Sequence, residues 1–402
     1  MSRLNAVPRD TLPADQRRFY DAVLAIRRRP VSGPFIVLMN GAPDLASRFA
    51  HLGHYFHSRG QADESVLTMR VRGFASLVGS RALDAPYEWS AWVNWALEAG
   101  VSQDTVDAIR ENRPLNLNPE EALIADFCGQ LLSGNHRVSD ATFGKALDHF
   151  GAQGLVELVM TLGYFAMIAL PLNAFEIEMT DAQKKLRKAF KPLEINGSPW
   201  SGPWAGRSGM PSIAGNVSAT PRLPKRITHD DVAPEHQLLL DRVIRTRGWI
   251  SGVYGVLMHS PDAADRTAVV GSYLLFESVL PPAIRALVWL VGARELDCAY
   301  TWHSGVLAAR DAGIDELLIS AIEKGGAKPA LSNEQDAVID FCHQLLRGNH
   351  HIDDAVYRRA IDNLGTKVSV LVAAMLGYIA MISLAANAFE IAPEEGATGP
   401  SL

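Results

Sequence analysis

The sequence predicts an all-α protein, and two observations carry that prediction. Apolar residues recur at three- and four-residue spacing along the chain, whereas runs that alternate apolar and polar residues are nearly absent. The chain also contains an internal repeat, and both copies show this helical spacing. With 402 residues, 48% of them hydrophobic, and a net charge of −6, the chain is a folded globular protein rather than a disordered one. Its mild acidity offers no general attraction to phosphate backbones, so we expect no nucleic-acid partner.

The repeat defines the domain organisation. Residues Asp126–Ile177 align with Asp340–Ile391 at a constant offset of 214, and 27 of the 52 aligned positions are identical. Each copy spans roughly 180 residues, which indicates tandem duplication of a domain rather than a short-period solenoid. We therefore expect two homologous helical domains, at residues 1–190 and 226–395. Residues 191–225 contain 5 Gly, 6 Pro and 5 Ser, a composition that disfavours helix and strand and predicts a linker.

The first helix is expected at Asp15–Arg29. Phe19, Val23 and Ile26 lie on one side of it, as the apolar face of an amphipathic helix requires. The arginines at 27–29 suit the negative end of the helix dipole. We interpret them as a solvated helix end.

Later helices are predicted from their end signals. Glu120–Leu132 follows an Asn-Pro pair, a capping residue and a first-turn proline. Ser139 and Asp353 are expected to cap the next helix in the two copies, and Gly151 and Gly365 lie near its end.

One segment is apolar enough to suggest a membrane span. Residues Val368–Ala386 contain no charged side chain over nineteen positions. The matching stretch of the first copy, Leu155–Leu172, contains Glu157 and Pro171, and neither stretch is flanked by basic clusters. We therefore predict buried core helices and no membrane partner.

The cysteines and the N-terminus indicate a reducing compartment. Cys128, Cys298 and Cys342 are too few and too scattered for a disulfide framework. The first residues lack the apolar core of a secretory signal, so we expect a cytoplasmic protein.

Three sequence blocks occur in both copies. The first is Met258-His259-Ser260-Pro261, with Met39-Asn40-Gly41-Ala42-Pro43 as its counterpart. The second is Arg-x-Leu-Asp-x-x-Tyr-x-Trp, which begins at Arg81 and Arg294. The third runs from Leu-Gly-Tyr to Asn-Ala-Phe-Glu and ends at Glu176 and Glu390. Together these blocks resemble the carboxymuconolactone decarboxylase and AhpD-like superfamily of all-α proteins, which assemble as trimers and hexamers. The resemblance implies two such domains in tandem and a homo-oligomer, with three chains forming a pseudo-hexamer, and a monomer is the alternative.

The resemblance also implies the catalytic residues. The central block of the family reads Tyr-Glu-Trp-x-x-His. The first copy keeps the glutamate as Glu88 but has Trp92 at the histidine position, whereas the second copy has Thr301 at the glutamate position. His303 lies two residues before the usual histidine, where some tandem relatives carry one. We therefore expect Glu88 and His303 to be the catalytic pair, in one composite pocket or in two non-equivalent ones.

The chemistry implied is acid–base catalysis without a cofactor. Decarboxylation beside a carbonyl, or isomerisation of a lactone, creates an enolate that a buried carboxyl or imidazole can stabilise and protonate. Asp84 and Asp297 are interpreted as helix caps, which places the motif at a helix N-terminus that favours an anionic substrate. The expected function is a cofactor-independent lyase or isomerase acting on a small organic acid or lactone. The alternatives are a hydrolase or cyclase on the same scaffold and a non-catalytic binding or assembly protein, because both motifs are incomplete.

Eight further residues are candidate substrate contacts. Aromatic side chains of the motif are expected to form the pocket wall, Arg294 to bind a carboxylate, and one cysteine and one histidine to lie nearby. The full set is Tyr87, Trp89, Trp92, His259, Arg294, Cys298, Tyr300 and Trp302. These residues also have structural interpretations. The tryptophans can belong to the core, the arginine can form an internal ion pair, and a histidine can be hydrogen-bonded within the fold. Glu88 can simply complement the helix dipole.

Two other chemistries are disfavoured. Thiol peroxidase activity of the AhpD type requires a resolving cysteine three residues after Cys298, and that position is Thr301. The histidines at 51, 54 and 57 have helical spacing, but the second copy lacks them, so we interpret them as an exposed helix face and expect no metal.

Overall fold

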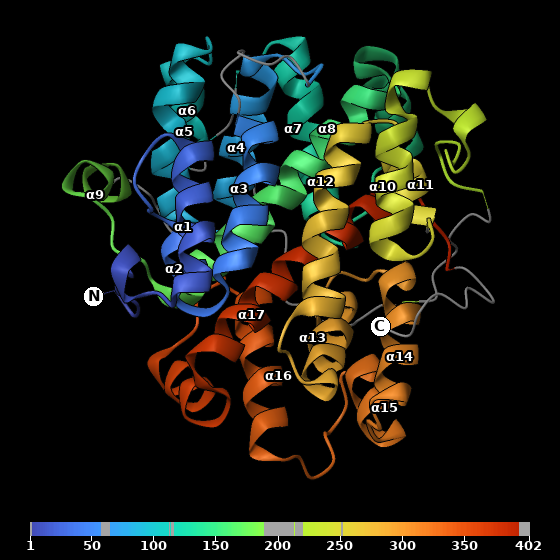
Figure 1. Ribbon diagram of the computed structural model, residues 1–402. Coiled ribbons are helices and arrows are strands. Elements are labelled where there is room, and N and C mark those ends of the chain that lie inside the picture. Colours follow the sequence, from blue (N-terminus) through green and yellow to red (C-terminus); the bar gives the residue numbers. More distant parts are fainter. Residues whose placement is uncertain are drawn as a thin grey trace.

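The computed structural model describes residues 2–57, 65–111, 113, 116–188, 213, 220–250 and 252–393. Within these residues it contains helices and no strand, which confirms the all-α prediction (Figure 1). The α-helices of the first half are α1 (Ala14–Arg27), α2 (Pro34–Gly41), α3 (Pro43–His57), α4 (Met69–Ala82), α5 (Pro86–Glu98), α6 (Gln103–Glu111), α7 (Pro119–Leu132), α8 (Asp140–Phe175) and α9 (Asp181–Lys188). Those of the second half are α10 (Gln237–Arg247), α11 (Gly252–Leu257), α12 (Pro261–Ser272), α13 (Pro282–Glu295), α14 (Ala299–Asp311), α15 (Glu316–Lys324), α16 (Asn333–Leu346) and α17 (Asp354–Ala388).

Most of the predicted helix ends are confirmed. Asn118 caps α7 and forms a capping box with Glu121. The side chains of Ser139 and Asp353 accept hydrogen bonds from the first turns of α8 and α17. Gly151 and Gly365 interrupt these two long helices with φ angles of 67° and 76°.

The prediction for Asp84 and Asp297 was wrong by one residue. Both adopt a left-handed conformation, with φ angles of 44° and 48°, and the helix caps are Ala85 and Cys298. Because the two cap residues follow them, the aspartates face back toward the preceding helix. The Asp84 carboxylate lies 3.8 Å from the guanidinium of Arg81.

The centre of the molecule is the pair of long helices α8 and α17, which pack along each other (Figure 1). At their crossing, a Cβ on Gly163 would lie 2.9 Å from the Cα of Met381, and a Cβ on Gly377 would lie 2.6 Å from the Cα of Met167. Only glycine permits so close a backbone approach. Both helices are long and apolar enough to cross a membrane, but their apolar windows are 100% and 94% buried in this core.

Helices α3 and α12 form a second contact between the halves. Arg48 on α3 stacks over the ring of Tyr273, 5.0 Å from its centroid. Arg266 on α12 stacks in turn over Tyr55 of α3, 5.1 Å from its centroid. Because each half supplies one arginine and one tyrosine, the contact is reciprocal, as at a two-fold interface.

Two arginines join the ends of the central helices. Arg3 donates to the carbonyl of Ala174 at 2.9 Å, at the end of α8, and to the carboxylate of Asp354 at 2.8 Å, at the start of α17. Arg222 makes the converse pair of contacts. It donates to the carbonyl of Val138 at 2.8 Å and forms ion pairs with Asp140 at the start of α8 and Glu390 after α17.

Arg222 and Pro224, in the last part of the predicted linker, are hydrogen-bonded to residues of the second half. Residues 222–225 were assigned to the linker, but Arg222 also donates its backbone N–H to Phe389. Pro224 accepts a hydrogen bond from His259 at 2.9 Å. This segment is therefore an N-terminal arm of the second half. Most of the predicted linker, residues 191–212 and 214–219, lies outside the described residues.

Arg222→Ala is expected to lower the free energy of unfolding by about 1–3 kcal/mol, because it leaves the Val138 carbonyl and two carboxylates without this donor. Urea unfolding measures the change. The control is Arg226→Ala, which removes the same charge immediately after this arm. Among the described residues, no hydrogen bond of the Arg226 side chain is seen. Equal losses from the two variants would contradict a specific role for Arg222.

Candidate functional site

Glu88 lies in the first turn of α5 and is only 4% exposed. Its side chain is hydrogen-bonded to Trp92, one turn further along the same helix. Burial raises the pKa of Glu88 to about 7, and the opposing effects of Arg29, the Trp92 hydrogen bond and Arg27 are smaller. At neutral pH this carboxyl is therefore present in both acid and base forms, as a general acid–base group requires.

Arg27, at the end of α1, places a positive charge near this carboxyl. Its guanidinium stacks on Phe35, 4.2 Å from the ring centroid, and donates to the carbonyl of Pro30 and the hydroxyl of Ser32. Among the described residues, no carboxylate forms an ion pair with it. Burial lowers the pKa of Arg27 to about 10, so it remains a cation at neutral pH. The sequence interpretation of a solvated helix end was wrong for Arg27, although Arg28 and Arg29 are exposed.

Two tyrosines complete this group. Tyr87 and Tyr164 are close enough to Arg27 and Glu88 to interact with them electrostatically. Tyr87 packs on Gly33, and the Tyr164 hydroxyl lies against Gly53, where a Cβ would be 2.4 Å away. We call Arg27, Tyr87, Glu88, Trp92 and Tyr164 the Glu88 cluster.

A cavity of about 390 Å³ adjoins the cluster. Tyr87 lines it, whereas Glu88 does not. The second half contributes His351, whose Nε2 lies 3.2 Å from the carbonyl oxygen of Asp84. The other lining residues come from the first residues of the chain, the start of α5, the end of α8 with the segment after it, and α9: Ser2, Pro86, Leu172, Asn173, Glu176, Ile177, Glu178, Met179 and Lys184. The start of α5 gives this cavity the positive end of a helix dipole.

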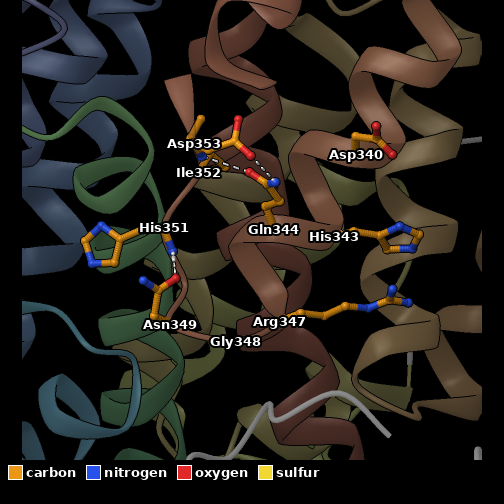
Figure 2. Close-up of a pocket in the computed structure, with 9 residues that line it drawn as sticks. All are labelled: Asp340, His343, Gln344, Arg347, Gly348, Asn349, His351, Ile352 and Asp353. Carbon is orange, nitrogen blue, oxygen red and sulfur yellow. Dashed lines mark hydrogen bonds between the residues drawn. The ribbon is translucent and has the colours of Figure 1, made fainter. Parts of the chain in front are cut away.

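A larger cavity, of about 650 Å³, lies between α16 and the start of α17 (Figure 2). Its three basic side chains point apart: His343 and Arg347 point to one side and His351 to the other, while Gln344 and Asp353 are hydrogen-bonded to each other. Arg347 is already paired with Glu295. Burial lowers the pKa of His343 to about 4, so its imidazole is neutral. This arrangement does not resemble a catalytic site.

The predicted catalytic pair is not brought together. Glu88 is on α5 and His303 is on α14, at opposite ends of the molecule (Figure 1). His303 is half-buried, and no hydrogen bond of its side chain is seen among the described residues. Glu88 and His303 therefore do not share one composite pocket within the chain.

Several predicted substrate contacts lie in the core. Arg294 is 3% exposed, and its Nε donates to the carbonyl of Glu323 while its guanidinium lies 3.7 Å from Asp297. His259 holds the arm of the second half through Pro224. Trp89 is 1% exposed, whereas Trp302 is half-buried. These positions favour the structural alternatives for Arg294, His259 and Trp89.

Cys298, expected to lie near the substrate, is in the core. Its side chain is fully buried, and burial raises the pKa of its thiol despite hydrogen bonds with Thr301 and Ser383. The thiol therefore stays protonated at neutral pH, and a thiolate nucleophile at Cys298 is disfavoured.

Sequence reasoning missed Arg27 and Tyr164. Tyr164 stands in the repeated Leu-Gly-Tyr segment, and that recurrence was a signal for it. Arg27 belongs to a run of three arginines. The sequence does not indicate which of the three points toward the interior, because that depends on the geometry of the helix.

Sequence reasoning also missed the buried carboxylate of Glu157. It accepts hydrogen bonds from Tyr55 at 2.7 Å, from Ser65 at 2.6 Å and from Ser260 of the second half at 3.2 Å. The hydrogen bond from Ser260 means that Glu157 links the two halves. Because neutral donors bind both of its oxygens, it has no free oxygen for catalysis.

The raised pKa of Glu88 predicts a pH-dependent stability. A carboxyl whose folded-state pKa is above its ordinary value destabilises the fold as pH rises from about 4.5 to about 7. Glu88→Gln removes this loss, so its free energy of unfolding relative to the wild type should rise by up to about 3 kcal/mol between pH 4.5 and pH 8. Urea unfolding across this range measures the difference. Glu98→Gln, at an exposed position on the same helix, is the control for the substitution itself, and a flat difference for Glu88→Gln would contradict the raised pKa.

The comparisons with known proteins give no independent indication of function. No protein-family model and no curated protein matches the chain.

Proposed function

We propose that the first half is a cofactor-independent acid–base site that acts on a small organic acid or lactone, as a lyase or an isomerase. The observation that carries the proposal is the buried Glu88 carboxyl with a pKa of about 7, beside a cation, Arg27, that has no carboxylate ion pair among the described residues. The resemblance of the surrounding motif to the carboxymuconolactone decarboxylase and AhpD-like superfamily supports the same reaction class.

The first step is binding. The guanidinium of Arg27 and the start of α5 both attract an anionic substrate. In this proposal a small substrate enters the cavity that Tyr87 lines and reaches the buried Glu88 carboxyl from there.

The second step is bond cleavage and protonation. In a decarboxylation, the bond between the α-carbon and the carboxylate breaks, and its electron pair passes to the neighbouring carbonyl as an enolate. Arg27 stabilises the negative oxygen, and the protonated Glu88 delivers its proton to the α-carbon. Water then reprotonates Glu88. An isomerisation uses the same groups, with Glu88 first removing the proton that it later returns.

The test is a substrate panel of β-keto acids and carboxylated unsaturated lactones, followed by proton NMR and by release of carbon dioxide. Turnover of a β-keto acid should fall as pH rises through about 7, because only the protonated Glu88 donates a proton. A Glu88→Gln enzyme with the same activity and pH profile as the wild type would contradict the proposal.

We further propose that the chain assembles with copies of itself. Among the described residues, large exposed apolar side chains are concentrated in the second half: Ile227, Leu238, Phe276, Val279, Leu307 and Leu317, against Val66 in the first. An excess of exposed apolar side chains on one half is expected where that half contacts another chain. Light scattering on the purified protein should give three times the chain mass of 43.7 kDa. A mass of one chain at all concentrations would contradict the proposal.

A further inference from the structure

The second half contains a counterpart of the Glu88 cluster. Arg247, at the end of α10, stacks over Tyr254, 4.4 Å from the ring centroid, as Arg27 stacks over Phe35. Arg247 also donates to the hydroxyl of Tyr378 at 3.3 Å. The hydroxyls of Tyr378 and Tyr254 are 3.0 Å apart.

The remaining members of this group are Tyr300 and Gly271. Tyr300 interacts electrostatically with both Arg247 and Tyr254. A Cβ on Gly271 would lie 2.3 Å from the Tyr378 hydroxyl and 3.0 Å from the Arg247 guanidinium, so only glycine allows the two groups to meet here. We call Arg247, Tyr254, Tyr300 and Tyr378 the Arg247 cluster.

Arg247 is short of hydrogen-bond acceptors. A guanidinium carries five N–H donors, and one hydrogen bond is seen for Arg247 among the described residues. No carboxylate of the described residues forms an ion pair with it, and it retains partial exposure to solvent. A partly buried cation with unused donors and three tyrosines around it is suited to an anion from solution.

The two clusters differ in one group that decides their chemistry. Where the first half has Glu88, the second has Thr301, whose hydroxyl is hydrogen-bonded to Ser383 at 2.9 Å and lies against the core. The Arg247 cluster therefore lacks the acid that would transfer a proton, and it also lacks that negative charge. It should bind an anion without converting it.

We propose that the Arg247 cluster is a non-catalytic binding site for a small organic carboxylate. The guanidinium recognises the planar carboxylate through paired N–H donors, and Tyr300, the partly exposed tyrosine of the cluster, contacts its apolar body. This inference does not depend on turnover at Glu88, because it rests on residues of the second half alone.

The test uses benzoate as the probe, with benzamide as its neutral analogue, and isothermal titration calorimetry as the readout. The Arg27→Gln protein should bind one benzoate per chain, with an affinity that falls as salt is added, and should not bind benzamide. Adding Arg247→Gln should weaken benzoate binding at least about tenfold. Unchanged benzoate binding after this second substitution would overturn the proposal, and so would equal binding of benzamide.

Two further measurements protect the result against misfolding. Arg247→Lys keeps the charge and the packing stem but loses the paired donors, so it should fold as the wild type and still bind benzoate more weakly. Glu88→Gln should leave benzoate binding at Arg247 unchanged. Loss of turnover in Glu88→Gln with benzoate binding retained is the result expected from both proposals. An Arg27→Gln protein that binds no benzoate would overturn the binding site at Arg247 and leave the proposed function standing.

Discussion

Glu88→Gln is expected to lower turnover by about 10²–10⁴-fold, the usual contribution of a positioned acid–base group. Glutamine keeps the size and the hydrogen-bonding capacity of the side chain, so the Trp92 contact and the packing of α5 should persist. Only the proton that Glu88 carries at neutral pH is lost. The measurement is kcat for the substrate found in the panel, together with a circular dichroism spectrum to show that the fold is intact.

The control for this variant is Glu98→Gln. It makes the same chemical change on the same helix at an exposed position, and it should leave kcat unchanged. Arg27→Lys is informative as well: it keeps the charge but loses the planar fork, so it should raise KM more than it lowers kcat if Arg27 binds the substrate. A Glu88→Gln protein with wild-type kcat would remove Glu88 from the mechanism.

Gly377→Ala is expected to lower the free energy of unfolding by about 1–3 kcal/mol or more. The added Cβ would lie 2.6 Å from the Cα of Met167 and 3.2 Å from the carbonyl oxygen of Ala166. These are backbone atoms of α8, which cannot rotate away as the end of a side chain can. The whole contact between α8 and α17 must therefore widen, which loosens packing on both sides.

The matched control is Gly144→Ala, a helical glycine with no atom near the position of a new Cβ. It should stabilise the protein by about 0.5–1 kcal/mol, because alanine loses less conformational freedom on folding. Gly163→Ala should destabilise for the same reason as Gly377→Ala, since its Cβ would meet Met381. The double variant should lose less than the sum of the two single losses, because one widening of the helix pair relieves both contacts. Denaturant unfolding measures all four, and a neutral Gly377→Ala would show that the crossing is looser than described.

Local signals in the sequence determined the class of fold and many helix ends. Helical spacing is a property of neighbouring residues, and caps such as Asn118, Ser139 and Asp353 act within one turn, so both can be read without knowing the tertiary structure. The prediction for Asp84 was wrong because the helix begins one residue later than its capping residue type indicated. Asp84 adopts a left-handed conformation instead of capping the helix. The repeat is equally a property of the sequence, and its origin by duplication stays a prediction.

The composition of the site was decided by contacts between distant segments. The sequence singled out Glu88 from its motif, but its pKa of about 7 depends on burial, and burial depends on how α4, α8 and α9 pack against α5. Arg27 and Tyr164 joined the cluster through the same packing, whereas His303 was placed on another face. Arg294 and Cys298 stand in the repeated block but are buried in the core.

The sequence by itself therefore determined that the protein is helical, that one block of residues recurs in both halves, and that the second block has Thr301 where the first has Glu88. Only the tertiary structure decided that the halves pack against each other through α8 and α17, and that Arg27 and Arg247 lie in equivalent tyrosine-rich surroundings. The physical reason is that helical periodicity and capping act over a few residues. Burial and charge pairing depend instead on which helices meet, and in this chain some helices that meet, such as α2 and α17, are separated by more than half its length.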